Sequence, residues 1–406
     1  MASLLAERRE RAVELAKTAE LPQFKGRPGW EFTDLSGLEL SSYEQASPNG
    51  AAVAERLFAL PGAVELTGTG PPSGELPEGV IVMALDRAAR QHQELVERHL
   101  GSVVATDDLF TVRNDAAFRE GGAFVYVPAG VTVEAPILLT AIQAAAGTEL
   151  ARRTLIVLDD GAEASVWEQQ LSDGDDIDAI FNTVVELVVG DGARLRFVCG
   201  QSLSERSWIF GTHRAEIGRD ASLDWVAFGF GSAGGRVRME TRLGGPGSEA
   251  RVTGAYASRG RQHIDFDTTQ EHAAPSTTSD LAFRGVLTGR STAVWKGNII
   301  VDPGAQKTDA FQESRNLLLS KRAHADAIPG LEIQANDVRC THAAAVAQVD
   351  TEQLFYLRAH GLPEAEAKRL VIEGFLSALV ERFEQGPVRE LLAGALERRL
   401  NAVLEG

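Results

Sequence analysis

Cysteine is scarce in this 406-residue chain, which contains only Cys199 and Cys340. Two cysteines cannot form a disulfide scaffold, so a reducing cytosol is the expected compartment. No apolar run approaches the length needed to span a bilayer. The first twenty residues also lack the apolar centre of a signal peptide, and Glu7, Glu10 and Glu14 fit poorly with a transit peptide. These absences predict a cytoplasmic protein with no membrane segment.

Positive charge is in short supply as well. The chain has 40 Lys and Arg against 57 Asp and Glu, a formal net charge of −17. Nucleic acids and anionic membranes both require a basic footprint, so neither is expected as the main partner. With 44% hydrophobic and 24% charged residues, the composition is that of a folded globular protein, and the length suggests two or three parts.

Common catalytic motifs are missing. The sequence contains no G-x-x-x-x-G-K-[ST], H-E-x-x-H or G-x-S-x-G, which excludes one route to nucleotide binding and two common hydrolase signatures. "GFGSAG" (229–234) matches G-x-G-x-x-G, but the alternating residues after it indicate a strand. A dinucleotide site needs a helix N-terminus at that point. We therefore reject it as a dinucleotide site.

What the sequence does have is a repeated turn. Stretches of alternating apolar and polar residues surround similar turns, in which Gly130, Gly161, Gly192, Asp220 and Gly247 recur at intervals of about thirty residues. Such strand–turn–strand units bury their apolar faces by stacking on one another. An antiparallel sandwich also uses short strands and glycine turns, but its turns are usually closer together. The pattern therefore favours a mainly β protein built as a β-solenoid.

Helical patterns flank the repeats. We predict an N-terminal helical region (1–105), a β-solenoid core (106–349) and a C-terminal helical region (350–406). In the last region Gly361 ends one helix, and Pro363 and Pro387 open the next two. The second of these helices has a wide apolar stripe, typical of packing within the chain but broad enough for a partner: Ile372, Phe375, Leu376, Leu379, Val380 and Phe383.

Two groups of residues could carry chemistry. His263, Asp265 and Asp267 share one face of a predicted strand, with His272 following, and could bind a metal or act as acid and base. A solvated or hydrogen-bonded outer face explains the same pattern, and we favour that interpretation.

The second group is "CTH" (340–342). Cys340 and His342 project from the same face of a strand, and thiolate and imidazole are good ligands for zinc or iron–sulfur species. Two ligands are too few for a four-coordinate site, so another chain would have to complete it. The alternative is a buried structural cysteine beside an unrelated histidine.

A longer pattern carries a family resemblance. The stretches 263–320 and 331–362, the second containing "LEIQANDVRCTH", resemble the SufB/SufD family of the SUF iron–sulfur cluster assembly system, and are most similar to its SufD-type members. "GWEFTDL" (29–35) is similar to the family's N-terminal element. The resemblance covers about residues 120–385 well and the first hundred residues loosely. It implies a right-handed parallel β-helix core with N-terminal and C-terminal helical segments.

The resemblance also implies a function. It predicts a non-catalytic scaffold subunit of a complex with SufB and the ATPase SufC, which assembles iron–sulfur clusters and passes them to apoproteins. His342 matches the family's functional histidine at the SufB–SufD interface, and Cys340 matches its neighbouring cysteine. No cofactor is expected on the chain alone, and a cluster would form at the interface with SufB. The sequence leaves flavin involvement and homodimer formation open.

The C-terminal helices are expected to bind SufC. The residues predicted to make this contact lie in two groups: Leu354, Phe355, Tyr356 and Leu357, then Ile372, Phe375 and Leu376.

Three positions depart from the family pattern. Asn336, Ala343 and His360 replace an acid before the valine, a glycine after the histidine and an arginine before the glycine that follows "FYL". These changes leave the Cys-x-His pair intact. They leave open the local turn geometry and charge.

Two rival functions remain at this stage. The first is a SufB-like primary cluster scaffold, which the presence of only one candidate interface cysteine disfavours. The second is a carbohydrate-active β-helix enzyme that uses His263, Asp265 and Asp267. Such enzymes commonly act outside the cell, and no secretion signal is recognisable here.

Overall fold

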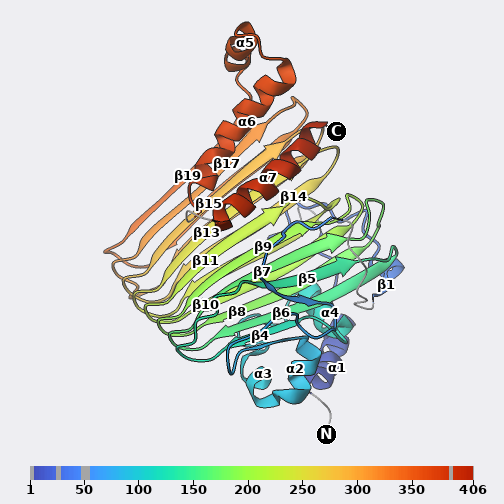
Figure 1. The fold of residues 1–406 in the computed structure, drawn as a ribbon, viewed down its shortest axis with the longest axis vertical. Helices are drawn as coiled ribbons and strands as arrows, with labels where there is room; N and C mark the ends of the chain where they lie inside the picture. The colour runs from blue at the N-terminus through green and yellow to red at the C-terminus, as the bar shows by residue number, and fades with distance from the viewer. Residues whose placement is uncertain (1–3, 24–28, 47–54, 384–386, 406) are drawn as a thin grey trace.

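A two-sheet parallel solenoid forms the centre of the computed structural model, which describes residues 4–23, 29–46, 55–383 and 387–405 (Figure 1). From β4 onward, consecutive strands alternate between the sheets, so each turn of the chain adds one strand to each sheet. The ladder is parallel throughout, except that β3 runs antiparallel to β4. The predicted parallel β-helix is confirmed.

The two sheets have nearly the same number of strands. Sheet A contains, in spatial order, β18 (His324–Ile333), β16 (Thr292–Val301), β14 (His263–His272), β12 (Gly234–Leu243), β10 (Trp208–Ile217), β8 (Ile180–Val189), β6 (Thr148–Leu158), β4 (Ala123–Val127) and β3 (Ile81–Met83), with β1 (Glu44–Gln45) on β6. Sheet B contains β19 (Arg339–Gln348), β17 (Asp309–Leu318), β15 (Thr278–Leu287), β13 (Glu249–Ser258), β11 (Ser222–Gly229), β9 (Arg194–Ser202), β7 (Glu163–Ser172), β5 (Ile137–Gln143) and β2 (Val64–Thr67).

The repeated turn has a conformational cause. Gly130, Gly161, Gly192 and Gly247 have φ angles of 69°, 68°, 67° and 75°, and Asp220 has 51°. Glycine adopts this left-handed region without steric cost, and aspartate is among the few other residues that tolerate it. The recurrence in the sequence therefore marks a turn position where the backbone is left-handed.

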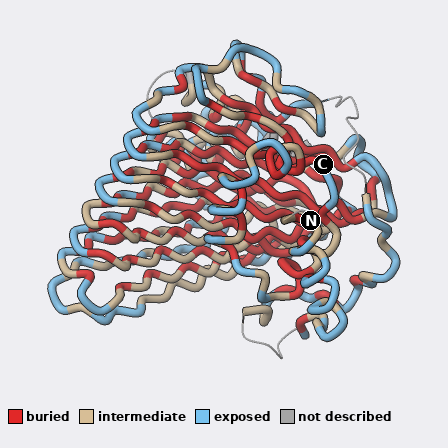
Figure 2. Tube along the Cα trace, turned by 90° about the horizontal axis from the view of Figure 1, so that it is seen from below, coloured by how far each residue is buried: buried red, intermediate tan, exposed pale blue. Residues whose placement is uncertain are grey.

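Large side chains fill the space between the sheets. Tyr256, Phe266, Phe283 and Trp295 follow one another, with ring centroids 5.9, 5.3 and 6.4 Å apart. All four are at most 4% exposed. Figure 2 shows the same division along the whole solenoid, with buried strands inside and exposed turns at the rim. The alternation in the sequence thus produces one large cluster of buried apolar side chains between the sheets.

We expect Gly254→Ala to destabilise the solenoid, because an added methyl group has no space there. A Cβ atom at Gly254 would lie 2.1 Å from Cε1 of Phe283, a ring with no exposed surface. Overpacking of this kind costs about 1–3 kcal/mol, which should lower the urea midpoint. Gly37→Ala is the matched control, since a Cβ there meets nothing within 4 Å. Equal midpoints for the two variants would contradict this packing.

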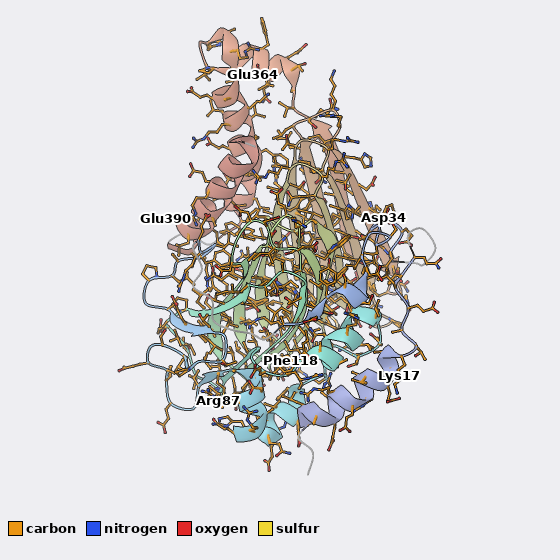
Figure 3. All side chains as sticks on the ribbon, turned by 90° about the vertical axis from the view of Figure 1, so that its right-hand side faces the viewer. Lys17, Asp34, Arg87, Phe118, Glu364 and Glu390 are labelled. Atoms are coloured by element: carbon orange, nitrogen blue, oxygen red, sulfur yellow. The ribbon has the colours of Figure 1, made fainter. Side chains whose placement is uncertain are left out.

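Helices from the first 120 residues lie at the first end of the solenoid: α1 (Leu4–Ala16), the short η1 (Leu40–Ser42), α2 (Leu85–Gln91), α3 (Gln93–His99) and α4 (Leu109–Ala117). Helices α2 and α3 are divided at His92, and Gly101 follows α3 with a φ of 78°. Figure 3 shows Lys17, Arg87 and Phe118 at this end and Glu364 at the opposite end. The same region also supplies β1, β2 and β3, and the division at residue 105 stays a prediction.

A buried ion-pair network attaches these helices to sheet A. Arg153 pairs with Asp115 and lies 2.9 Å from Glu186, and all three side chains are at most 4% exposed. The Glu186 carboxylate also accepts hydrogen bonds from the backbone N–H groups of Gly101 and Val104. Each buried charge therefore has a partner of opposite sign.

The C-terminal helices are α5 (Thr351–Ala359), α6 (Glu364–Val380) and α7 (Pro387–Glu405). The predicted breaks are confirmed: α5 ends just before Gly361, α6 begins after Pro363, and α7 begins at Pro387. Helices α6 and α7 pack on the outer face of sheet B, and α5 extends beyond it (Figure 1). The apolar side chains of α6, α7 and the segment joining them that pack over sheet B are Leu379, Phe383, Leu392, Ala395 and Leu396. Within the described ranges, no helix is both long and apolar enough to cross a membrane.

Candidate functional site at the open end of the solenoid

The solenoid ends in a coil whose two strands have no further neighbour in the described part of the chain. β18 closes sheet A and β19 closes sheet B, each with ten residues. Their side chains are far more exposed than those of earlier coils, and Ile333 and Val346 are 44% and 42% exposed. This coil is a long edge with free backbone groups, which is a template for another strand.

Cys340 and His342 lie on this coil, in β19. They are the register partners of Ala310 and Gln312 in β17, whose side chains are buried in the interior. Cys340 is half-buried and packs against the interior cluster that contains Ile299 and Ala310. Residues two apart in a strand share a face, so His342 also faces the open interior, where it is exposed. The structure therefore brings the pair together as its spacing predicts.

A row of polar side chains lies directly beneath the pair. Gln312, Ser314 and Asn316 alternate along β17 and all point inward, and each is at most 2% exposed. The Tyr256 hydroxyl donates to Asn316 Oδ1 at 2.5 Å. The interior below the exposed end is thus polar, as it also is at the buried ion pair of Arg152 and Glu168 nearer the first end.

The two thiols differ in access. Burial raises the pKa of the Cys340 thiol, and the carboxylate of Asp309 adds to the rise. Burial raises the pKa of Cys199 well above its ordinary value, with a further contribution from Glu168 that Arg152 opposes. Both cysteines are free and stay protonated near neutral pH.

We expect iodoacetamide to alkylate Cys340 but not Cys199 in the folded chain, because Cys199 is only 7% exposed. The attacking species is the thiolate. Since the pKa of Cys340 is raised, the rate should be low at pH 7 and rise about tenfold per pH unit toward pH 9. Peptide mapping by mass spectrometry identifies the modified residue, and unfolding in guanidinium should make both react. A rate for Cys340 that is independent of pH would contradict this expectation.

The His263 group lies on the outer face of β14 and is already occupied by the chain's own N-terminal segment. The Thr33 hydroxyl bonds the Asp265 carboxylate and lies 3.3 Å from Nε2 of His263. Burial lowers the pKa of His263 and raises that of Asp265. Asp267 pairs with Arg236, whose guanidinium lies 5.1 Å from the Trp30 ring.

His272 does not join this group. It points to the opposite face, into the interior, where its ring nitrogens lie 2.7 and 2.9 Å from the hydroxyls of Thr277 and Ser279. Among the described residues, no three His, Cys, Asp or Glu side chains are arranged to hold a metal ion. The hydrogen-bonded interpretation of this stretch therefore fits the structure.

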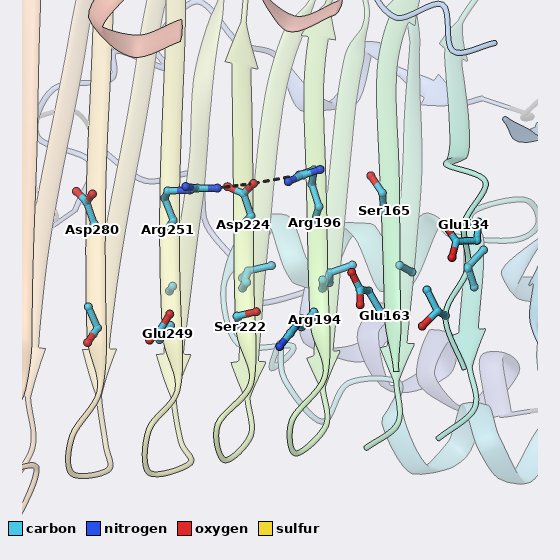
Figure 4. Close-up of a pocket in the computed structure, with 17 residues that line it drawn as sticks. Glu134, Glu163, Ser165, Arg194, Arg196, Ser222, Asp224, Glu249, Arg251 and Asp280 are labelled. Atoms are coloured by element: carbon cyan, nitrogen blue, oxygen red, sulfur yellow. Dashed lines mark hydrogen bonds and ion pairs between the residues drawn. The ribbon is translucent and has the colours of Figure 1, made fainter. Parts of the chain in front are cut away.

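A groove that the sequence analysis did not find crosses the outer face of sheet B (Figure 4), with a volume of about 600 Å³. At its centre Arg196 and Arg251 both contact the carboxylate of Asp224, at 3.0 and 3.1 Å. Strand register places Asp280 next in this row, where Arg382 contacts it at 3.0 Å. The charges recur at the same interval as the turns, and this signal could have predicted the row.

The residues predicted to contact the ATPase fall into two environments. In α5, Phe355 and Tyr356 are 75% and 62% exposed, and Leu354 and Leu357 are half-buried. The α6 residues pack within the chain: Ile372 and Leu376 are buried with Val286 and Leu317, and Phe375 is half-buried beneath Arg284. Ile372 and Leu376 also line a cleft of about 530 Å³ between α6 and α7.

The three departures from the family pattern leave the pair undisturbed. Ala343 lies between His342 and Ala344 and belongs to the other face of β19. Asn336 lies in the exposed turn before this strand. His360 ends α5, where Nδ1 is 2.9 Å from the Tyr356 carbonyl oxygen.

Fold and site together define a parallel β-solenoid with its potential ligands on an open edge, not in a closed pocket. Comparison with known families agrees. The description "SUF system FeS cluster assembly, SufBD core domain" matches residues 141–375, and "SufBD protein N-terminal region" matches 66–139. The chain belongs to the SufBD family of iron–sulfur cluster assembly proteins, which confirms the resemblance seen in the sequence.

Individual relatives extend this result. The iron–sulfur cluster assembly protein SufD of Bacillus subtilis is 34% identical over 326 residues, which cover 80% of this chain and 74% of that protein. A SufBD family protein of Mycobacterium tuberculosis is 36% identical over 53% of this chain and 56% of its own length. One from Synechocystis is 25% identical over 96% and 91%. The similarity to the Synechocystis protein therefore includes both helical ends.

Proposed function

We propose that this chain is a SufD-like scaffold subunit of a complex that assembles iron–sulfur clusters and passes them to apoproteins. The observation that carries the proposal is the position of Cys340 and His342, side by side on the exposed terminal coil. A partner seated on this coil would come directly against both side chains. The chain itself would be non-catalytic and would act by holding its cargo and its partners.

The partner for this edge would be SufB. β19 is ten residues long and pairs with β17 on one side only, so the backbone groups of alternate residues are free on its other side. An exposed edge of this length binds another strand through main-chain hydrogen bonds. Ile333 and Val346 supply exposed apolar surface beside it. The cluster is the cargo of such an interface. The Cys340 thiolate and the His342 imidazole would supply part of its ligands, and SufB would supply the rest.

Energy would come from a separate ATPase, SufC, since this chain has no phosphate-binding loop motif. Phe355 and Tyr356 on α5 are the two most exposed large apolar side chains among the described residues. Exposed aromatic residues of this kind are typical centres of binding energy in protein interfaces. We therefore place the ATPase contact on α5 and the adjoining part of α6. The few cysteines make the cytosol the proposed compartment.

The rival functions have less support. A polysaccharide-cleaving enzyme would need free carboxylates at Asp265 and Asp267, but Thr33 and Arg236 already bind them. A SufB-like primary scaffold would rest on Cys340 alone, since Cys199 is buried inside the solenoid.

Co-expression with the SufB and SufC chains of the same organism tests the proposal. Intact-complex mass measurement should show this chain together with both partners. Proline substitutions in β19, at Ala344 and Val346, remove two backbone donors from the edge and should release SufB without releasing SufC. A chain that stays alone in the presence of both partners would overturn the proposal.

A further inference from the structure

We infer that Gln312 is a positioning residue for His342: its side-chain oxygen accepts a hydrogen bond from the imidazole and selects one tautomer. The inference rests on the proposed function for its biological meaning, but the hydrogen bond can be tested without it. It comes from a buried acceptor that no described residue satisfies, on the residue that pairs with the exposed His342 in the strand register.

The register brings the two side chains together. Gln312 and His342 are Cα partners in the parallel ladder of β17 and β19, and neighbouring strands lie about 4.8 Å apart. Both side chains leave the sheet on the interior face. At this spacing an imidazole N–H can reach an amide oxygen on the adjacent strand.

The orientation of the Gln312 amide is fixed by its other contacts. Nε2 donates to the carbonyl oxygens of Gly297 at 3.3 Å and Gly330 at 3.0 Å. Carbonyl oxygens only accept, so the amide cannot be turned around. Oε1 is left as an acceptor, fully buried and without a donor among the described residues. A buried acceptor without a donor destabilises the fold by about 1–3 kcal/mol. A hydrogen bond from a nearby N–H would remove that cost.

Two donors can reach this region. One is the imidazole of His342, and the other is the indole N–H of Trp295, which is buried and also lacks a partner. Trp295 and Gln312 Oε1 both approach Gly297 from the interior. We favour His342, because its backbone is in register with Gln312 and its exposed ring is free to rotate onto the acceptor.

The hydrogen bond would decide where the metal-binding lone pair of His342 points. In a neutral imidazole one nitrogen carries the proton and the other can bind a metal, and the hydrogen bond made by the first decides which is which. A bond to Gln312 would hold the protonated nitrogen toward the solenoid interior. The other nitrogen would then present its lone pair at the open end, toward the partner.

The first test is nitrogen NMR of the full chain labelled with ¹⁵N-histidine. The His342 signals are identified by their absence in His342→Ala. We expect one tautomer to dominate in the wild type, and Gln312→Met to shift the ratio toward that of histidine in a short peptide. Gln270→Met is the matched control, since Gln270 is another buried interior glutamine with an unpartnered Oε1 on the opposite sheet. An unchanged ratio in Gln312→Met would overturn the inference.

A reciprocal measurement covers the case in which Gln312→Met fails to fold. The side-chain carbonyl carbon of Gln312 should shift in His342→Ala, a change at an exposed edge, and stay in place in Thr341→Ala. A shift caused by Trp295→Phe alone would assign the bond to the indole and overturn the inference.

Cluster formation is the measurement that separates the proposed function from the hydrogen bond. Removing an outer partner of a metal-binding histidine typically costs tenfold to a hundredfold, so Gln312→Met should lower cluster formation about tenfold. If His342→Ala forms clusters normally while the tautomer result holds, the proposed function fails and the hydrogen bond stands.

Discussion

Replacement of His342 by alanine should leave the complex with SufB and SufC assembled and lower cluster formation at least tenfold. The side chain is exposed on the terminal coil, so its removal takes no packing from the fold. A neutral imidazole binds a metal without losing a proton. The Cys340 thiol must lose one, and burial raises its pKa. Cys340→Ala should therefore have the milder effect.

Two measurements check this result. Complementation of a strain that depends on the SUF system reports function, and iron and sulfide content of the purified complex reports cluster formation. Thr341→Ala is the matched control, because Thr341 lies between the two residues and points to the outer face. If His342→Ala complements fully, or fails only because the subunit no longer folds, Cys340 and His342 have a structural role and the prediction is wrong.

Joint replacement of Phe355 and Tyr356 by glutamine should weaken ATPase binding at least tenfold. These two rings form the exposed aromatic surface of α5, and loss of a single aromatic anchor can cost about 2 kcal/mol or more. Glutamine is a good helix former, so α5 should persist. Calorimetric titration of SufC onto the variant measures the change in Kd.

The control for this experiment is Leu15→Gln in α1. Leu15 is 41% exposed, and α1 lies at the end of the molecule opposite α5 (Figure 1). A double variant that binds SufC with wild-type affinity would move the contact to the cleft between α6 and α7. Deleting all three helices is less informative, because α6 and α7 cover Phe228 and Val226 on sheet B.

Local rules predicted most of the solenoid. The turns along this rim need a left-handed residue, and glycine or aspartate at that position is visible in the sequence for the first five turns. Ser276 and Lys307 take the position in the next two, where the sequence gives no such signal. The period of two along a strand likewise predicted that Cys340 and His342 share a face. The period could not predict whether that face points into the solenoid or out of it, because this depends on how the strand pairs with β17.

Contacts between distant segments could not be predicted. Thr33 covers His263 and Asp265 from more than 200 positions away, and no local period records that contact. The sequence predicted the apolar stripe of α6. It could not predict that the stripe packs on sheet B, because that contact depends on the strands beneath the helix. The unpartnered oxygen of Gln312 required the register of β17 against β19.

The two ends of the solenoid have different consequences for stoichiometry. The first end finishes in the short strands β2 and β3, of four and three residues, beside the N-terminal helices. The last finishes in two full-length strands. A solenoid whose first and last coils both bound another solenoid would add further molecules and grow into a fibre. A solenoid that binds only through its last coil stops growing once one partner is bound. Under the proposed function, each chain is therefore expected to join one other solenoid through this coil.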